Sequence, residues 1–380
     1  MRVLITGGAG FIGEKLARKF QANGATVTVV DNLSGQVHGA NSEFNPMLVN
    51  VATCVKGDVR DRDLMRRALV DQEVIVHLAA ETGTGQSMYA VEHYADVNVQ
   101  GTAVLLDLLM NERSSSLTKV IVASSRAIYG EGQHRCSQHG IVYPGARTEA
   151  SMSTGSFDPV CPQCGKVTAV MPTAEITPSS PSSFYGLTKQ VQEQMILMFA
   201  SALGIDGFAL RYQNVYGPGQ SLTNPYTGIL AVFSNLVRQG KAINIFEDGE
   251  ESRDFVYVDD VVDATFACAQ RDVRGVMALN VGSGNRTTVL QVANAVIKHF
   301  DAEVPVAISG AYRVGDIRHN VADISQIMAL TGYAPKWHFD DGLKAFLDWA
   351  TDHEAIDSGF DQSMKELSDR QLLRTAKVNN

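Results

Sequence analysis

The chain has 380 residues, of which 45% are hydrophobic and 19% charged, and its formal net charge is −9. This balance indicates a folded globular protein rather than a disordered chain. The sequence has no apolar run of the roughly 18–20 residues that span a bilayer, and no Lys/Arg block that would bind nucleic acid. Its N-terminus lacks the long apolar stretch of a signal peptide, so we expect a cytoplasmic protein with neither membrane nor nucleic-acid partners.

Short apolar runs alternate with helical patterns through the first 130 residues. Such alternation predicts an α/β fold, a doubly wound parallel sheet of the Rossmann type with right-handed crossovers. The predicted strands, rich in β-branched residues, are Val3–Ile5, Thr26–Val30, Val74–Leu78 and Val120–Ala123, and the helices between them are Phe11–Ala22, Asp61–Val70 and Val97–Asn111.

The pattern changes between about residues 131 and 180, where Gly, Pro, Ser, Cys and His dominate, and we interpret this stretch as an insertion. We expect a first domain over 1–212, a smaller lobe over 213–355 interleaved with it, and a polar, loosely attached tail over 356–380. The later predicted elements are a strand at Gly207–Tyr212 and helices at Tyr185–Leu203, Thr227–Gln239, Asp260–Ala269, Val289–Phe300 and Asp341–Asp352.

A glycine-rich run, GGAGFIG at 7–13, lies between the first predicted strand and the first predicted helix. Gly7, Gly10 and Gly13 permit a tight turn and close approach of a pyrophosphate to the backbone. The pyrophosphate would rest on the helix N-terminus, which begins with Phe11 and Ile12. The placement of this run predicts a dinucleotide site.

Asp31 ends the second predicted strand, where its carboxylate would accept hydrogen bonds from an adenosine ribose. Neither Asn32 nor Leu33 supplies a cation for a 2′-phosphate, which favours NAD over NADP. Asp58 is an expected adenine contact, although it also fits a turn before a helix, and His77 is interpreted as a packed residue. The remaining expected cofactor contacts are Asn32, Val59, Leu78, Ala79, Ala80 and Asn98.

Tyr185 and Lys189 are four residues apart, so a helix places them on one face. A neighbouring ammonium would lower the tyrosine pKa from about 10 and make the phenol a base near neutral pH. Such pairs are also common on ordinary helix surfaces. The glycine run and Asp31 favour the catalytic interpretation here.

These motifs together resemble the extended short-chain dehydrogenase/reductases of the nucleotide-sugar epimerase/dehydratase family. The resemblance covers roughly residues 1–350. Beyond GGAGFIG and Asp31, it rests on GDV at 57–59, HLAA at 77–80, SSRAIYG at 124–130, YGLTK at 185–189, RYQNVYGPG at 211–219, RDFVYVDDV at 253–261, NVGSG at 280–284 and GDIRH at 315–319.

The resemblance implies a role for each matching residue. Ser125 would hydrogen-bond the reacting sugar oxygen, Tyr185 would move its proton, and Lys189 would also bind the nicotinamide ribose. The first domain would then hold NAD tightly, and the lobe would hold a nucleotide-sugar. The implied substrate contacts are Thr84, Ser125, Arg126, Asn214, Arg253 and Arg313; the alternative for the arginines of the lobe is a surface ion pair.

The residues after Ser125 bear on the reaction. Dehydratases and decarboxylases of this family resemble one another in carrying acidic residues there, whereas this chain has Arg126 and Ala127. We therefore expect C4 epimerisation through a transient 4-keto sugar. The alternatives are a 4-ketoreductase or dehydrogenase, and a non-catalytic dinucleotide sensor. The SSRAIYG and HLAAETGTGQS stretches and the insertion resemble those of dTDP-L-rhamnose 4-epimerases, which implies a dTDP-linked deoxysugar.

The insertion contains a Cys-x-x-His pair and a Cys-x-x-Cys pair, formed by Cys136, His139, Cys161 and Cys164. Four such ligands suit a tetrahedral structural zinc and leave no open coordination position. A metal would also order a long polar loop. The alternatives are free thiols and a Cys161–Cys164 redox pair.

The predicted helices Val97–Asn111 and 186–203 carry apolar residues on more than one face. Equivalent helices of the resembling family pair across a two-fold axis, which implies a homodimer. The alternative is burial of these faces within one subunit.

Overall fold

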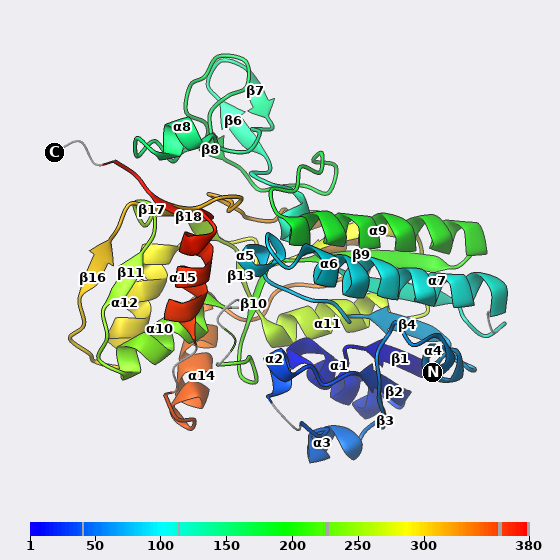
Figure 1. Ribbon diagram of the computed structural model, residues 1–380. Helices are drawn as coiled ribbons and strands as arrows, with labels where there is room; N and C mark the ends of the chain where they lie inside the picture. The colour runs from blue at the N-terminus through cyan, green and yellow to red at the C-terminus, as the bar shows by residue number, and fades with distance from the viewer. Residues whose placement is uncertain (40–41, 113–114, 223, 225–227, 356–358, 378–380) are drawn as a thin grey trace.

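The centre of the molecule is a seven-stranded sheet in which every neighbouring pair is parallel (Figure 1). The computed structural model describes residues 1–39, 42–112, 115–222, 224, 228–355 and 359–377. The fold-class prediction is confirmed. In spatial order the strands are β14 (Val276–Val281), β9 (Asp206–Tyr212), β5 (Lys119–Ser125), β4 (Val74–His77), β1 (Arg2–Thr6), β2 (Thr26–Asp31) and β3 (Thr53–Lys56).

Helices cover both faces of the sheet, which explains why the inner strands are apolar along their whole length. Leu16, Ala17 and Phe20 belong to a core cluster on one face, and a second cluster lies on the other face. The first face is covered by α1 (Phe11–Ala22) and α11 (Val258–Cys268), and the second by α4 (Arg62–Ala68), α7 (Gly101–Glu112) and α9 (Phe184–Leu203).

The helix predicted over Val97–Asn111 differs from its prediction at the start. It begins with a π-helical segment, Ala95–Gln100, which continues into α7. Such wider turns are frequent at functional sites. The segment places the side chain of Asn98 in the interior.

The smaller lobe is built from short helices and strand pairs that follow β9, on the left in Figure 1. Thr227, the predicted start of one helix, lies outside the described residues. The main elements are α10 (Ile229–Arg238), α12 (Val289–His299), α13 (Ser325–Thr331), α14 (Phe339–Thr351), β10 (Asn214–Tyr216) with β13 (Phe255–Tyr257), β11 (Ile243–Ile245) with β16 (Val306–Ile308), and β12 (Ser252–Arg253) with β15 (Thr287–Thr288).

The prediction of a loosely attached tail is wrong for the part that the structure describes, residues 359–377. Helix α15 (Phe360–Asp369) buries Leu367, and β18 (Leu373–Thr375) pairs antiparallel with β17 (Ala311–Arg313). A few apolar side chains in a polar segment, together with backbone pairing, are enough to dock it. Composition alone missed both.

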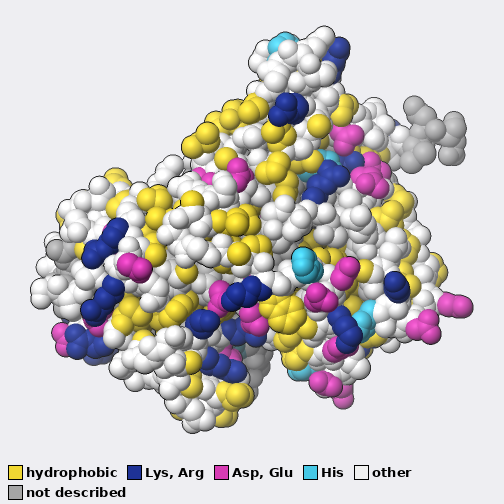
Figure 2. Space-filling model, turned by 180° about the vertical axis from the view of Figure 1, so that it is seen from behind, with side chains coloured by type: hydrophobic (Ala, Val, Ile, Leu, Met, Phe, Trp, Pro, Cys, Tyr) yellow, Lys and Arg dark blue, Asp and Glu magenta, His cyan; other side chains and the backbone are white. Residues whose placement is uncertain are grey.

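The insertion forms a knob at the top of the molecule (Figures 1 and 2). Its three-stranded antiparallel sheet has the order β7 (Gly140–Val142), β6 (His134–Cys136), β8 (Ala169–Val170), and α8 (Glu149–Met152) lies beside it. The other short helices among the described residues are α2 (Gly35–His38), α3 (Pro46–Val49), α5 (Thr84–Ser87), α6 (Val91–Tyr94) and a 3-10 turn, Arg126–Ile128.

Within the described ranges, no helix has both the length and the apolar character that a membrane span requires. On the face that Figure 2 shows, Lys and Arg side chains are interspersed with acidic ones rather than gathered in a broad basic patch.

Candidate active site

The glycine turn between β1 and α1 lies against the end of β4. Gly7 has φ +67°, and a Cβ there would come within 2.7 Å of the backbone N of Ala79. A Cβ on Gly13 would come within 2.5 Å of the Gly7 carbonyl oxygen. Gly10 is the N-cap of α1, so the N–H groups of Phe11 and Ile12, in the first turn of the helix, face this turn and can bind an anion there. The backbone cradle has the form that a pyrophosphate requires.

Asp31, only 8% exposed at the end of β2, is held by the turns on either side of it. Its Oδ2 accepts a hydrogen bond from the N–H of Ala9 (3.0 Å), and its Oδ1 accepts one from Leu33 (2.9 Å). The amide of Asn32 donates to Asp58 (3.1 Å). Arg60 also binds Asp58 and lowers the pKa of its carboxyl to about 2. The carboxylates of residues 31 and 58 thus flank one end of the glycine turn.

The turn after β4 contains Leu78, Ala79 and Ala80, all half-buried. Asn98 is fully buried and binds this turn: its Oδ1 accepts from the N–H of Glu81 (2.7 Å), and its Nδ2 donates to the hydroxyl of Thr188 (3.0 Å) on α9. The side chain of Asn98 therefore joins two parts of the site through protein contacts. Val59, another predicted cofactor contact, is buried in the core.

His77 is packed, as the sequence indicated. Its ring lies between the hydroxyls of Thr6 (2.7 Å) and Thr102 (3.0 Å). Burial lowers the pKa of this ring to about 3, so it is neutral at physiological pH.

Ser125, Tyr185 and Lys189 come together at the carboxyl end of β5. The hydroxyl of Ser125 is hydrogen-bonded to that of Tyr185 and also accepts the N–H of Ala127 (3.1 Å). The ammonium of Lys189 donates to the carbonyl oxygen of Ala123 (3.0 Å). Ser183 caps α9 and thereby fixes the start of the helix that carries both other groups.

The electrostatics of this group differ from the expectation in one respect. Burial raises the pKa of Tyr185, and the interactions that oppose this rise are the Ser125 hydrogen bond and the charge of Arg126. Burial also lowers the pKa of Lys189 to about 7, so at neutral pH it is only partly charged. Arg126, rather than Lys189, is therefore the cation that lowers the Tyr185 pKa in this structure.

Three arginines gather around one carboxylate that the sequence reasoning missed, Asp316. The carboxylate accepts from Arg313 (2.6 Å) and Arg253 (3.2 Å). Burial would raise the pKa of Asp316, but Arg313, Arg253 and Arg126 hold it well below its usual range. The GDIRH motif contains Asp316, so the signal was present, but only the fold shows which charges it meets.

Two polar atoms of this cluster, Nη1 of Arg126 and Nε of Arg313, are buried and have no hydrogen-bond partner among the described residues, and the same holds for Oδ1 of Asn214 in β10. Buried polar groups are normally paired, so these atoms suit a polar ligand. Thr84 begins α5, and Ser87 of the same helix accepts the N–H of Tyr185 (2.9 Å). The predicted substrate contacts, Thr84, Ser125 with Arg126, Asn214, Arg253 and Arg313, come from five separate segments.

The fold brings the four Cys and His side chains of the insertion together in space. The four ligand atoms of Cys136, His139, Cys161 and Cys164 lie within 4.8 Å of one another. The sulfurs of Cys136 and Cys164 are 3.7 Å apart, and Nδ1 of His139 is 3.4 Å from the sulfur of Cys161. A tetrahedron with Zn–S bonds of about 2.3 Å has edges of about 3.8 Å. Hydrogen bonds, first from the N–H of Gln138 and then from His139 and Cys161, lower the pKa of Cys136 to about 6, which favours the thiolate.

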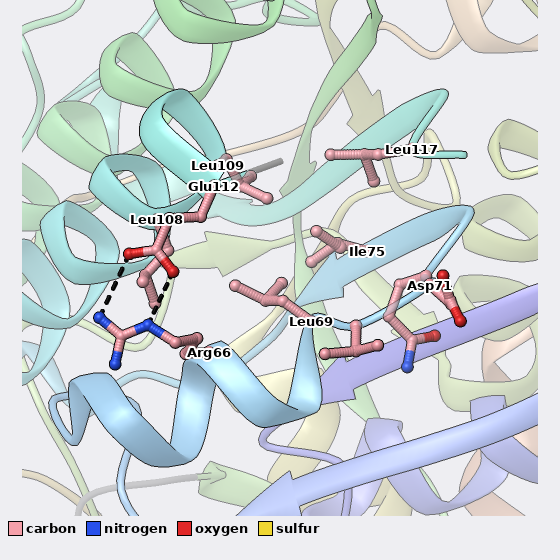
Figure 3. A pocket seen from close by; sticks show the side chains of 10 residues that line it. Arg66, Leu69, Asp71, Ile75, Leu108, Leu109, Glu112 and Leu117 are labelled. Atoms are coloured by element: carbon pink, nitrogen blue, oxygen red, sulfur yellow. Dashed lines mark hydrogen bonds and ion pairs between the residues drawn. The ribbon is translucent and has the colours of Figure 1, made fainter. Parts of the chain in front are cut away.

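A hollow of about 250 Å³ lies elsewhere, between α4 and α7 (Figure 3). Apolar side chains, including Ile75 and Leu117, line it, and the Arg66–Glu112 ion pair crosses one side. It is next to the amino ends of β4 and β5, whereas Ser125 is at the carboxyl end of β5. This hollow is therefore separate from the active site.

A doubly wound sheet with this Ser–Tyr–Lys group has the architecture of the short-chain dehydrogenase/reductases. A family model for the NAD dependent epimerase/dehydratase family matches residues 3–282. A dTDP-L-rhamnose 4-epimerase from Burkholderia thailandensis is 39% identical, with 92% of this chain and 94% of that protein covered. The chain belongs to the NAD-dependent epimerase/dehydratase family, and the resemblance drawn from its motifs is confirmed.

Solved structures agree with this assignment. A Thermotoga maritima UDP-glucose 4-epimerase with UDP-glucose matches with a TM-score of 0.74 at 30% identity, covering 93% of this chain and 99% of that one. A Thermus thermophilus UDP-glucose 4-epimerase in complex with NAD matches with a TM-score of 0.72 at 27% identity, covering 92% and 98%.

Proposed function

We propose that this NAD-dependent nucleotide-sugar 4-epimerase interconverts dTDP-L-rhamnose and dTDP-6-deoxy-L-talose. The observation that carries the proposal is the hydrogen-bonded Ser125–Tyr185 pair beside Arg126 at the end of β5. This arrangement supplies a proton-transfer group and a cation, and it places no carboxylate at positions 126 and 127, where elimination of water would need one.

The first domain, 1–212, has residues that fit NAD. The glycine turn would hold the pyrophosphate and Asp31 the adenosine ribose, while Asn32, Asp58 and Val59 would flank the adenine side. Leu78, Ala79 and Ala80 would line the path toward the nicotinamide, and Asn98 would hold that turn in place. When bound, NAD accepts a hydride from the sugar and later returns it.

The chemical roles follow from the contacts of each side chain. Tyr185 removes the proton of the sugar C4 hydroxyl and later returns it, while Ser125 hydrogen-bonds the same oxygen. Arg126 stabilises the phenolate form of Tyr185 by its charge. Lys189, anchored to Ala123, would bind the nicotinamide ribose.

The lobe at 213–355 would bind the nucleotide and its diphosphate. Arg253 and Arg313 present cationic groups beside Asp316, and the unpaired Oδ1 of Asn214 would accept a hydrogen bond from the substrate. Thr84, at the start of α5, would contact the sugar. The Burkholderia thailandensis relative supports a dTDP-linked deoxysugar, whereas UDP-glucose 4-epimerases among the relatives make UDP-sugars the competing substrates.

The test is incubation of the purified protein with dTDP-L-rhamnose, with no added cofactor, followed by NMR of the sugar. We expect the C4 epimer to form from cofactor that copurifies with the protein. Conversion of UDP-glucose but not of dTDP-L-rhamnose would replace the proposed substrate. Net consumption of added NADH or NADPH with a 4-keto sugar would instead indicate a ketoreductase.

We also propose that Cys136, His139, Cys161 and Cys164 hold a structural zinc. The distances within the cluster match the edges of a zinc tetrahedron, and all four positions are filled by protein ligands. Elemental analysis of protein purified without chelators is expected to find one zinc per chain. A value near zero, with free thiols by titration, would refute the metal site.

We infer a homodimer through α7 and α9. Leu187 and Met198, eleven residues apart on α9, are 44% and 61% exposed, and Met110 of α7 is 50% exposed. Residues eleven apart share a helix face, so these side chains suit a helix–helix contact. Light scattering is expected to give twice the chain mass for the protein and for Met47→Glu, whose exposed side chain is on α3, but a monomer for Met198→Glu.

A further inference from the structure

A buried arginine of the insertion, Arg147, contacts the lobe that carries the substrate arginines. Its side chain is 3% exposed. Its Nε donates to Glu131 (2.9 Å), its Nη1 to Glu247 (2.7 Å), and its Nη2 to the backbone carbonyl of Asp316 (3.0 Å). One guanidinium thus connects residue 131, at the start of the insertion, to the backbone of the carboxylate that binds Arg253 and Arg313.

Glu131 also binds the segment that contains Asp316 directly. Its other oxygen accepts the N–H of Arg318 (2.9 Å), two residues beyond Asp316. The guanidinium of Arg318 binds Glu247 (2.9 Å). The backbone carbonyl oxygen of Arg318 accepts a hydrogen bond from Arg253 (2.9 Å). Residues 316–318 are therefore fixed between carboxylates of the insertion and of the lobe.

A short backbone path leads from this network to the Cys/His cluster. The ring of His134 is hydrogen-bonded to the carbonyl oxygen of Glu131 (3.2 Å) and to the hydroxyl of Thr168 (2.9 Å). His134 begins β6, and Cys136 ends it. Strand β6 thus carries Cys136 of the Cys/His cluster at one end and, at the other, His134, whose ring contacts the backbone of Glu131.

We propose that Arg147 is a positioning residue, through which the Cys/His insertion places Asp316 and with it the two arginines that bind the substrate diphosphate. Arg147 itself touches no substrate: it acts through the backbone of residue 316. This inference rests on the proposed function, which assigns the diphosphate to Arg253 and Arg313. It gives the insertion a role that the reaction chemistry does not require.

The matched variants are Arg147→Met and Arg135→Met, because both remove an arginine from the insertion and the Arg135 side chain is exposed. Binding of dTDP and of UDP to the NAD-containing protein is measured by calorimetry, and zinc content by elemental analysis. We expect Arg147→Met to weaken binding of the preferred diphosphate about ten-fold and to raise KM with kcat changed less than about two-fold. Arg135→Met is expected to match the unaltered protein.

Arg147→Lys provides the second variant. It keeps the charge in the buried network but cannot reach three partners as the planar fork does, so we expect an intermediate loss of affinity. If Arg147→Met does not fold, Arg147→Lys still tests the positioning role by the same affinity measurement.

Unchanged diphosphate affinity and KM in a folded, zinc-loaded Arg147 variant would overturn the positioning role alone. A fall in kcat with unchanged affinity would also overturn it. If the unaltered protein bound neither dTDP nor UDP, the proposed function would fail, and this inference with it.

Discussion

The central sheet and the insertion are stabilised by different interactions. Strand β1 buries Val3, Leu4 and Ile5 completely, within a core that continues into the helices on both faces. The insertion has one small cluster, Val142 with Cys136 and Cys161, and a second in which Met152 and Phe157 pack against Tyr312 and Ala376. Apolar burial stabilises the sheet, whereas the insertion, with so little apolar core, depends more on its ion pairs and would gain from the proposed zinc. A large domain thus tolerates a polar insertion whose stability has a separate origin.

The largest effect, a loss of turnover, is expected from a substitution in the catalytic group at the end of the sheet. Tyr185→Phe removes the hydroxyl that is bonded to Ser125, and turnover should fall about 10²–10⁴-fold with the fold intact. Tyr143→Phe, an exposed position in the insertion, is the control and should leave turnover unchanged. Activity is followed by NMR of the epimer. Residual activity within ten-fold of normal would refute the catalytic role.

A Val→Ala substitution in each region compares how much each core contributes to the free energy of unfolding. Val122→Ala, in fully buried β5, should lower the free energy of unfolding by about 2–3 kcal/mol. Val142→Ala, 3% exposed in the insertion, should lower it by less than about 1 kcal/mol, because unfolding of the sheet does not depend on this small core. Denaturant titration measures both. Equal losses would show that the two regions unfold as one unit.

Lys189→Met should inactivate the protein yet stabilise it, by an amount on the order of 2 kcal/mol near pH 7. Burial lowers the Lys189 pKa from its ordinary value of 10.5 to about 7. Between these values the unfolded chain binds a proton that the native protein does not, so native stability falls as pH decreases from 10.5 to 7.

The gain from Lys189→Met should therefore be largest at and below about pH 7 and vanish toward pH 10.5. Thermal unfolding across this range measures it. A variant less stable than the unaltered protein at pH 7 would contradict the prediction.

Metal removal is expected to have the smallest effect and to be confined to one region. A chelator that strips the Cys/His cluster should weaken dTDP binding about ten-fold, because the Glu131–Arg147 contacts loosen, while NAD affinity stays unchanged. Calorimetry with each ligand separates the two. Loss of NAD binding on chelation would show that the insertion supports the whole fold.

Local sequence patterns predicted much of the molecule. The glycine run, Asp31 at a strand end and the four-residue spacing of Tyr185 and Lys189 are short-range features, so their geometry follows from one turn or one helix. The edge strands β3 and β14 were missed. Strand β3 is short and half exposed, so apolar periodicity does not mark it.

By itself, the sequence determined the doubly wound fold, the Tyr185–Lys189 pair and the two Cys/His pairs of the insertion, because each depends on local patterns; Ser125 was identified by the family resemblance of its motif. Only the tertiary structure decided which charges meet. Asp316 binds Arg313, three residues before it, and the distant Arg253, and Arg147 reaches its backbone from the insertion. The pKa of Tyr185 likewise depends on burial and on Arg126 rather than on Lys189. Such long-range contacts depend on how elements pack, which no local pattern encodes.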